Sequence, residues 1–244
     1  IKAAPHRARR YLGTVSGGSK RQDMLYVLPA VSVSFQKQSA NAAITSGNNI
    51  YQFDGATFDV FESTNGARVG TVQMDSNGRA QATLLPNTAY YLVETKAPAG
   101  YVSRHDRIAF TTGNDGGKVA IDEQPGTINL RIVKLDAATN AGHQVGASLA
   151  GAEFTCVSQS TPGWAQILTT DESGRATLAD VPLGTFTIYE SKAPEGYLPS
   201  NDSWTYTVGA DQLGDSGVVE IESRVSDIPI AFNLEISKFK DYGN

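Results

Sequence analysis

Two copies of one short stretch constrain the fold of this chain more than any other feature. The first copy covers residues 90–101, with the sequence YYLVETKAPAGY, and the second covers residues 186–197, with the sequence FTIYESKAPEGY. Successive side chains of a β-strand point to opposite faces, so Glu94 and Glu190 each share a face with the apolar residues before them. Burying a lone carboxylate is costly. Because a glutamate occurs on the apolar face at the same position of both copies, the sequence predicts a partner for each glutamate that offsets this cost.

Other motifs recur with the same spacing and indicate an internal duplication. A Gly-Ala-x-Phe motif occupies 55–58 and 151–154, and an Asp-x-x-Gly-Arg-Ala turn motif occupies 75–80 and 171–176, in both cases 96 positions apart. Each repeat of roughly 100 residues contains many short strands separated by turn signals, which is typical of immunoglobulin-like sandwiches. The sequence therefore predicts an all-β protein with two tandem immunoglobulin-like β-sandwich domains.

We expect four parts along the chain. They are a basic N-terminal segment at 1–30, which is a tail or the remnant of a preceding domain, a first sandwich domain at 31–130, a second at 131–236, and a tail or the start of a further repeat at 237–244. The strand expected at 126–134 would end the first domain and begin the second. Such a joint has almost no linker, so we expect the pair of domains to be stiff.

Charge and cysteine content narrow the class of protein. The formal net charge of -5 argues against nucleic acid as the main partner. No stretch approaches the roughly 20 consecutive apolar residues of a membrane span. The single cysteine, Cys156, excludes an intramolecular disulfide. Sparse cysteine suits the cytosol, and it equally suits a secreted protein stabilised by another kind of cross-link.

Two further residue types recur with the glutamates. Each first strand carries a lysine on its inner face, Lys37 in one domain and Lys134 in the other, and each last strand carries an asparagine, Asn129 and then Asn233. Lysine, glutamate and asparagine therefore appear together twice, which predicts a three-residue centre in each domain core. The alternative is that the lysines extend to the surface and the glutamates are solvated at strand ends.

These motifs resemble a known family. The E-x-x-A-P-x-G-Y box, the Gly-Ala-x-Phe strand and the first-strand lysine look like the CnaB, or SpaA-like (prealbumin-like), repeat of Gram-positive pilins and cell-wall-anchored surface proteins, over roughly residues 31–233. The resemblance implies spontaneous isopeptide bonds, in which Lys37 and Lys134 join Asn129 and Asn233. It also implies that Glu94 and Glu190 act as catalytic proton shuttles, with no metal and no cofactor.

The chemistry of the three residue types agrees with this implication. Burial lowers the pKa of a lysine and raises that of a glutamate, so both tend towards their neutral forms. A neutral amine is a nucleophile, whereas an ammonium is not. A protonated glutamate can polarise the carboxamide and carry protons while ammonia leaves. Each bond forms only once, so we expect self-processing rather than an enzyme with turnover.

The resemblance implies a structural function. We expect a subunit or stalk segment of a Gram-positive surface pilus or cell-wall-anchored protein, located outside the cell. Its implied partners are other pilin subunits, or cell-wall peptidoglycan through a sortase, and a host surface ligand. The alternative is an adhesin module that binds a host matrix protein or glycan through the loops at one end of a sandwich.

Weaker signals favour structural interpretations. His105 precedes Asp106, but no serine or cysteine lies in a nucleophile context, so catalysis by this pair is not expected. The Asn-Asp-Gly-Gly run at 114–117 lacks calcium-ligand spacing and predicts a turn. Cys156 is expected to be a small core residue, with a thioester to Gln159 as the alternative.

Overall fold

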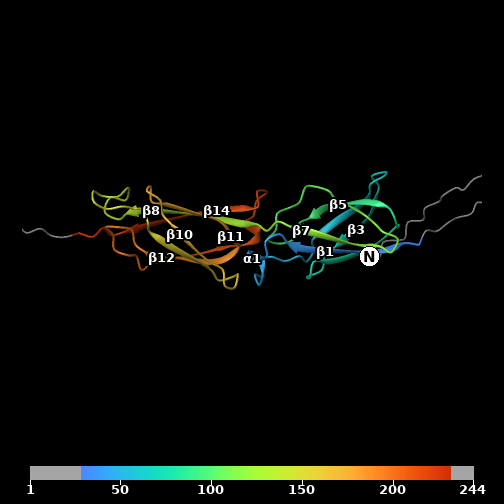
Figure 1. Ribbon diagram of the computed structural model, residues 1–244, viewed down its shortest axis with the longest axis horizontal. Coiled ribbons are helices and arrows are strands. Elements are labelled where there is room, and N and C mark those ends of the chain that lie inside the picture. The colour runs from blue at the N-terminus through green and yellow to red at the C-terminus, as the bar shows by residue number, and fades with distance from the viewer. Residues whose placement is uncertain (1–28, 232–244) are drawn as a thin grey trace, which may run out of the picture.

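A computed structural model describes residues 29–231 as two β-sandwiches that lie end to end along one long axis (Figure 1). This confirms the prediction of an all-β chain with two tandem domains. Nearly all of the basic segment, Asn233 and the expected tail at 237–244 lie outside the described residues. Within residues 29–231, no helix is long and apolar enough to cross a membrane.

The first domain packs a three-stranded sheet on a four-stranded sheet. Its strands are β1 (Val31–Ser39), β2 (Thr57–Glu62), β3 (Arg68–Gln73), β4 (Arg79–Leu84), β5 (Ala89–Lys96), β6 (Ile108–Thr111) and β7 (Gly117–Glu123), and it has one short helix, α1 (Ala42–Thr45). The strand orders are β4-β1-β7 and β3-β2-β5-β6.

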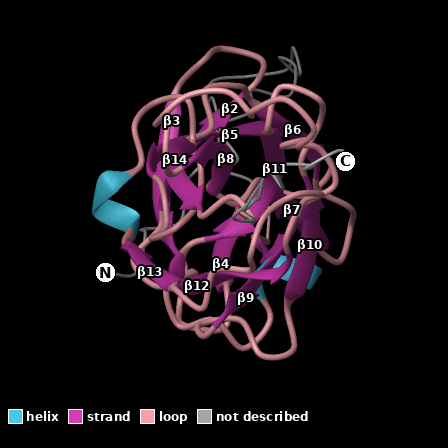
Figure 2. Ribbon diagram, turned by 90° about the vertical axis from the view of Figure 1, so that its left-hand side faces the viewer, coloured by secondary structure: helices cyan, strands magenta, loops and turns pink. Residues whose placement is uncertain are grey.

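The second domain repeats this arrangement strand for strand. Its strands are β8 (Thr127–Asp136), β9 (Glu153–Ser158), β10 (Ala165–Thr169), β11 (Arg175–Pro182), β12 (Gly184–Lys192), β13 (Ser203–Val208) and β14 (Val218–Asp227), with a 3-10 turn, η1 (Ala210–Gln212). The strand orders are β11-β8-β14 and β10-β9-β12-β13. Seen along the long axis, strands and loops make up most of the molecule, and one of the short helical segments projects at the left-hand edge (Figure 2).

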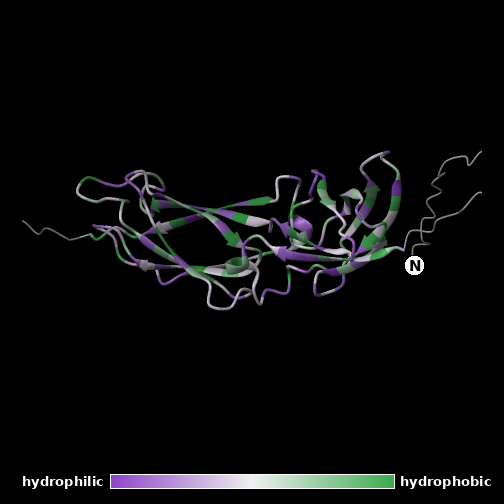
Figure 3. Ribbon diagram, turned by 45° about the vertical axis from the view of Figure 1, so that its right-hand side comes forward, coloured by the Kyte–Doolittle hydropathy of each residue, from purple (hydrophilic) through white to green (hydrophobic). Residues whose placement is uncertain are grey.

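The cores follow from the alternation of side chains along the strands. On β1, Val33, Phe35 and Lys37 are buried while the residues between them are not. On β8, the buried set includes Ile128, Leu130, Ile132 and Lys134. Figure 3 shows apolar and polar residues alternating along the strands of both sandwiches. In each domain one lysine therefore occupies a core position.

The first and last strands of each domain are parallel neighbours. Ser39 on β1 pairs with Glu123 on β7, and Asp136 on β8 pairs with Asp227 on β14. The strand expected to be shared between the domains is not shared, because β8 pairs only with β11 and β14 of the second domain. The closing strand of the first domain is instead β7.

The joint between the domains is built from the loop that contains α1. Tyr51 from this loop is part of the core of the second domain. Its hydroxyl donates to the Gly126 carbonyl and accepts from the Leu183 N–H, both at 2.8 Å. The buried side chain of Asn48 donates to the Leu183 carbonyl at 2.8 Å and to Thr161 Oγ1 at 3.0 Å. Buried, directional bonds thus fix the second domain on the first.

We expect the substitution Tyr51→Phe to loosen this joint. It removes one hydroxyl and leaves the buried N–H of Leu183 without its acceptor, which costs about 1–3 kcal/mol. Denaturant unfolding followed by tryptophan fluorescence measures the loss, because Trp164 and Trp204 both lie in the second domain. The matched control is Tyr189→Phe, at a tyrosine that is 41% exposed. Equal unfolding midpoints for the two variants would contradict the prediction.

Candidate functional site

The second domain holds a lysine between two carboxylates in its core. Lys134 projects inward from β8, and its Nζ donates to Glu190 Oε1 at 2.6 Å and contacts Asp227 Oδ1. All three side chains are fully shielded from solvent. Glu190 comes from β12 in the facing sheet, whereas Asp227 ends the neighbouring strand β14. The lysine therefore links the two sheets as well as the first and last strands.

The first domain contains the equivalent arrangement. Lys37 Nζ donates to Glu94 Oε1 at 2.8 Å and contacts Glu123 Oε2, and these side chains are at most 1% exposed. In both domains the second oxygen of the box glutamate accepts a backbone N–H, from Arg104 at 2.7 Å and from Ser200 at 2.8 Å. Each glutamate is thus held from both sides and aimed at its lysine.

An aromatic ring forms one wall of each centre. The Gly-Ala-x-Phe motifs supply Phe58 and Phe154, whose ring centroids lie 4.7 Å from Lys37 Nζ and 5.2 Å from Lys134 Nζ. Such rings exclude water while their faces attract a cation. The motif that marked the duplication therefore has a direct role at the lysine.

Burial changes the acidity of the carboxylates on the last strands. It raises the pKa of Asp227 to about 6, and the nearby charge of Glu190 adds to the rise while Lys134 opposes it. Burial likewise raises the pKa of Glu123, with the charges of Lys37 and Arg104 opposing the rise. Asp227 is therefore shifted strongly towards the protonated acid, which is the form of a carboxyl group that an amine can attack, whereas two cations oppose the smaller shift of Glu123.

The structure brings some of the sequence-predicted residues together and separates others. Lys37 contacts Glu94 and Lys134 contacts Glu190, in agreement with the alternation of side chains along their strands. Asn129 does not reach Lys37. It lies on the outer face of β8, where its amide donates to Glu220 Oε1 at 2.8 Å. Asn129 and Lys134 are five positions apart on β8, so their side chains point to opposite faces of the sheet. Because Lys134 points into the core, Asn129 points outward, and the expected pairing of Asn129 with Lys37 is corrected.

Glu123 and Asp227 occupy the positions expected for the asparagines, and sequence reasoning missed both. Each precedes a proline by two residues, at Pro125 and Pro229, and the two acids are 104 positions apart. This is the same spacing that drew attention to Asn129 and Asn233. The proline two residues after each acid is the sequence signal that marks both carboxylates.

The remaining candidates have structural positions. Cys156 is buried in the second core, and burial raises the pKa of its thiol to about 12. The Gln159 amide donates to Thr187 Oγ1 at 2.8 Å. His105 is exposed. Within the described part of the chain, no group of three or more His, Cys, Asp or Glu side chains is arranged to hold a metal ion.

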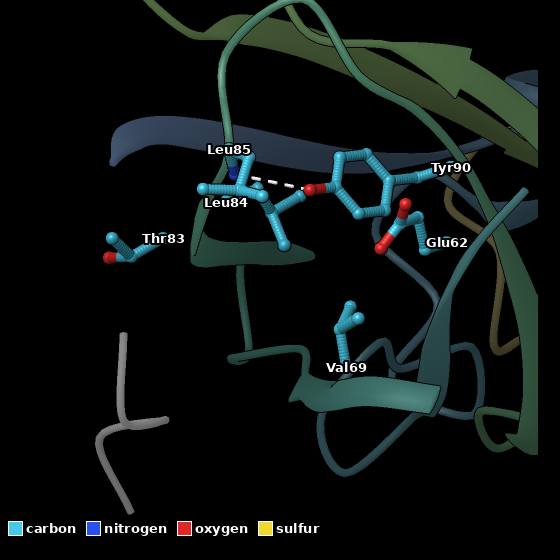
Figure 4. A pocket seen from close by; sticks show the side chains of 6 residues that line it. All are labelled: Glu62, Val69, Thr83, Leu84, Leu85 and Tyr90. Atoms are coloured by element: carbon cyan, nitrogen blue, oxygen red, sulfur yellow. Dashed lines mark hydrogen bonds between the residues drawn. The ribbon is translucent and has the colours of Figure 1, made fainter. Parts of the chain in front are cut away.

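A small pocket lies at the other end of β5 from Glu94 (Figure 4). It is lined by Glu62, Val69, Thr83, Leu84, Leu85 and Tyr90. The Tyr90 hydroxyl accepts from the Leu85 N–H at 3.1 Å, so it is occupied in fixing the loop. Glu62 is the one ionisable group besides this tyrosine in the lining, which gives the pocket no acid–base pair comparable to the lysine centres.

Comparisons with known proteins agree with this architecture. A family model described as the SpaA prealbumin-like fold domain matches residues 43–125 and 129–222. The fold is similar to that of the Bacillus anthracis TIE protein, with a TM-score of 0.59 and 23% identity over 83% of this chain and 34% of that one. No similar protein was found among curated sequences.

Two pilus proteins are also similar. A Streptococcal ancillary pilin matches with a TM-score of 0.33 and 20% identity, over 82% of this chain and 62% of that one. A C-terminal fragment of the pilus adhesin SpaC from Lactobacillus rhamnosus GG matches with a TM-score of 0.47 and 16% identity, over 84% of this chain and 100% of that one. The chain thus spans about a third of the TIE protein and less than two thirds of the ancillary pilin.

Proposed function

Because this chain belongs to the family of SpaA prealbumin-like fold domains, we propose that it is a structural segment of a Gram-positive pilus or cell-wall-anchored surface protein, stiffened by an amide bond between its own side chains. The observation that carries the proposal is the buried centre in which Lys134 lies between Glu190 and Asp227. A lysine buried between two carboxylates contributes little to the stability of a core, because the cost of removing the charges from water offsets their attraction. The same arrangement does place an amine in contact with an acid with which it can react.

The bond joins Lys134 Nζ to the side-chain carboxyl carbon of Asp227. If all three groups were ionised, the centre would carry a net charge of -1, which burial disfavours, so Asp227 takes up a proton. Lys134 passes one proton to Glu190 and becomes a neutral nucleophile. The nitrogen attacks the carboxyl carbon, the C–N bond forms, and the C–O bond breaks.

Glu190 balances the protons of this step. It accepts the proton that the attacking nitrogen must lose and returns one to the departing hydroxyl group, so that water leaves. Its position, 2.6 Å from Lys134 Nζ, suits this exchange. The sum is one ammonium, one carboxylic acid and the carboxylate of Glu190 giving one amide, one water and a protonated Glu190. The dry core favours the amide because water is excluded.

The cross-link would join the two strands that carry force through the second domain. β8 is its first strand and β14 its last, and they lie parallel and adjacent. Tension entering on β8 would leave through the amide and β14 without stretching the residues between them. We place such a segment outside the cell, joined to other pilin subunits or to peptidoglycan by a sortase.

Intact mass under denaturing conditions tests the proposal. We expect the wild-type chain to be lighter than its sequence by one water, and a branched peptide to join Lys134 to Asp227 after digestion. The variant Glu190→Gln should have its full sequence mass. The matched control is Lys192→Ala, at an exposed lysine of the same box that pairs with Glu153 on the surface, and it should keep the deficit.

The identity of the lost group distinguishes two acceptors. Loss of water assigns the bond to Asp227, whereas loss of ammonia, with a branched peptide to Asn233, would assign it to the asparagine suggested by the sequence. A wild-type chain with its full sequence mass would overturn the proposed function.

A further inference from the structure

The two lysine centres differ by one charged group. In the second domain, one cation faces two carboxylates. In the first domain, Arg104 lies beside the same arrangement, with its Nε 3.9 Å from Glu123 Oε1. The residue 96 positions later, at the equivalent place after the second box, is Ser200. Both residues donate their backbone N–H to the box glutamate, but only Arg104 adds a positive charge.

The guanidinium of Arg104 is fixed in this position. Nη1 donates to both carboxylate oxygens of Asp106, at 2.9 and 3.1 Å, and Nη2 contacts the carbonyl of Asp122. Asp106 is 67% exposed, so solvent screens its charge. The Nε atom of Arg104 is buried without a hydrogen-bond partner and is the guanidinium atom that approaches Glu123. The positive charge is therefore available to Glu123.

We infer that Arg104 keeps the first centre ionic, so that Lys37 and Glu123 remain an ion pair and only the second domain forms a cross-link. This inference rests on the proposed function, because it assigns the reaction to one of two similar centres. Arg104 acts as a specificity-determining residue that does not itself react.

The charges of the two centres explain the difference. Lys37 and Arg104 together balance Glu94 and Glu123, so the first centre is neutral with every group ionised, and it needs no additional proton. If Lys37 passes its proton to Glu94, Glu123 still faces the guanidinium, whose charge favours the carboxylate form of Glu123. A carboxylate is a poor electrophile, and no water can leave from it without a further proton. The second centre has no arginine in this position, and its net negative charge favours the uptake of a proton by Asp227.

The acceptor itself adds a second difference. Glu123 has one more methylene group than Asp227, so one more rotatable bond must be fixed to place its carboxyl carbon beside the amine. Correct placement of the reacting atoms accounts for a large part of the rate in reactions of this kind. The charge of Arg104 and the longer side chain of Glu123 therefore both disfavour an amide bond in the first domain.

Conversion of the first centre into a copy of the second tests the inference. The double variant Arg104→Ser with Glu123→Asp reproduces the residues found at 200 and 227. We expect its intact mass to fall short by two waters, with a second branched peptide joining Lys37 to position 123, while the wild type falls short by one. Arg104→Lys with Glu123→Asp retains the cation and should fall short by only one.

Each outcome has a distinct meaning. A wild-type deficit of two waters, with Lys37 joined to Glu123, would overturn the inference and leave the proposed function intact. A double variant that folds, by its circular dichroism, but loses only one water would also overturn it. A wild-type chain that has lost no water would overturn the proposed function, and the inference with it. Because the wild-type digest alone tests the first centre, the inference does not depend on the variants folding.

Discussion

The variant Glu190→Gln should unfold at a much lower denaturant concentration than the wild-type chain in its second domain. A cross-link between Lys134 and Asp227 would close a loop of roughly 100 residues, which is worth about 4.7 kcal/mol in the chain-entropy model. Glutamine has nearly the same shape as glutamate and can still accept the Ser200 N–H. Lys134 and Asp227 would remain as a charge-balanced pair, so we attribute most of the expected loss of about 4–5 kcal/mol to the missing amide.

Tryptophan fluorescence isolates this effect. Both tryptophans of the chain, Trp164 and Trp204, pack against the core of the second domain. Guanidinium titrations of wild type and Glu190→Gln therefore compare the same domain with and without the bond. The matched control, Glu94→Gln, makes the same change in the first domain and should leave the tryptophan transition in place. Coincident transitions for wild type and a Glu190→Gln chain of full sequence mass would refute the stabilising role of the bond.

The fold was predictable because its signals are local. The box, the Gly-Ala-x-Phe motif and the hairpin turns each specify a strand or a turn within a few residues. Alternation along a strand also placed Lys37, Lys134, Glu94 and Glu190 inside, since parity depends only on positions in one strand. The lysine–glutamate half of each centre could therefore be derived before the structure.

The acceptors were not predictable in the same way. Which residue meets Lys37 depends on the register of β1 against β7, two strands separated by most of the domain. The alternation of side chains along one strand gives no information on how that strand is aligned with another. The contribution of Arg104 has the same origin, because it comes from a loop after the box and approaches Glu123 only in the folded domain.

The joint shows another limit of sequence reasoning. The loop at 40–56 is rich in small and polar residues, as surface loops are, yet Asn48 is buried and Tyr51 enters the neighbouring core. Its polar groups are satisfied by the second domain rather than by water. Composition alone does not distinguish a solvated loop from one covered by another domain.

The two domains should respond differently when the chain is stretched from its ends. If only non-covalent contacts join β1 to β7, as we infer, the first sandwich should open and release residues 31–123, which span about 310–335 Å when fully extended at about 3.3–3.6 Å per residue. In the second domain the amide would carry the load from Lys134 to Asp227 and prevent a comparable step.

Single-molecule force spectroscopy with handles at the two ends measures these steps. We expect one long extension in the wild type and two in Glu190→Gln, because the second domain then has no cross-link. Two long steps in the wild type would show that Lys134 carries no covalent load, and none would show that Lys37 is also cross-linked. The joint at Tyr51 and Asn48 breaks without releasing a folded core, so it does not add a step of this length. The number of long steps thus counts the domains that lack an amide, independently of any mass measurement.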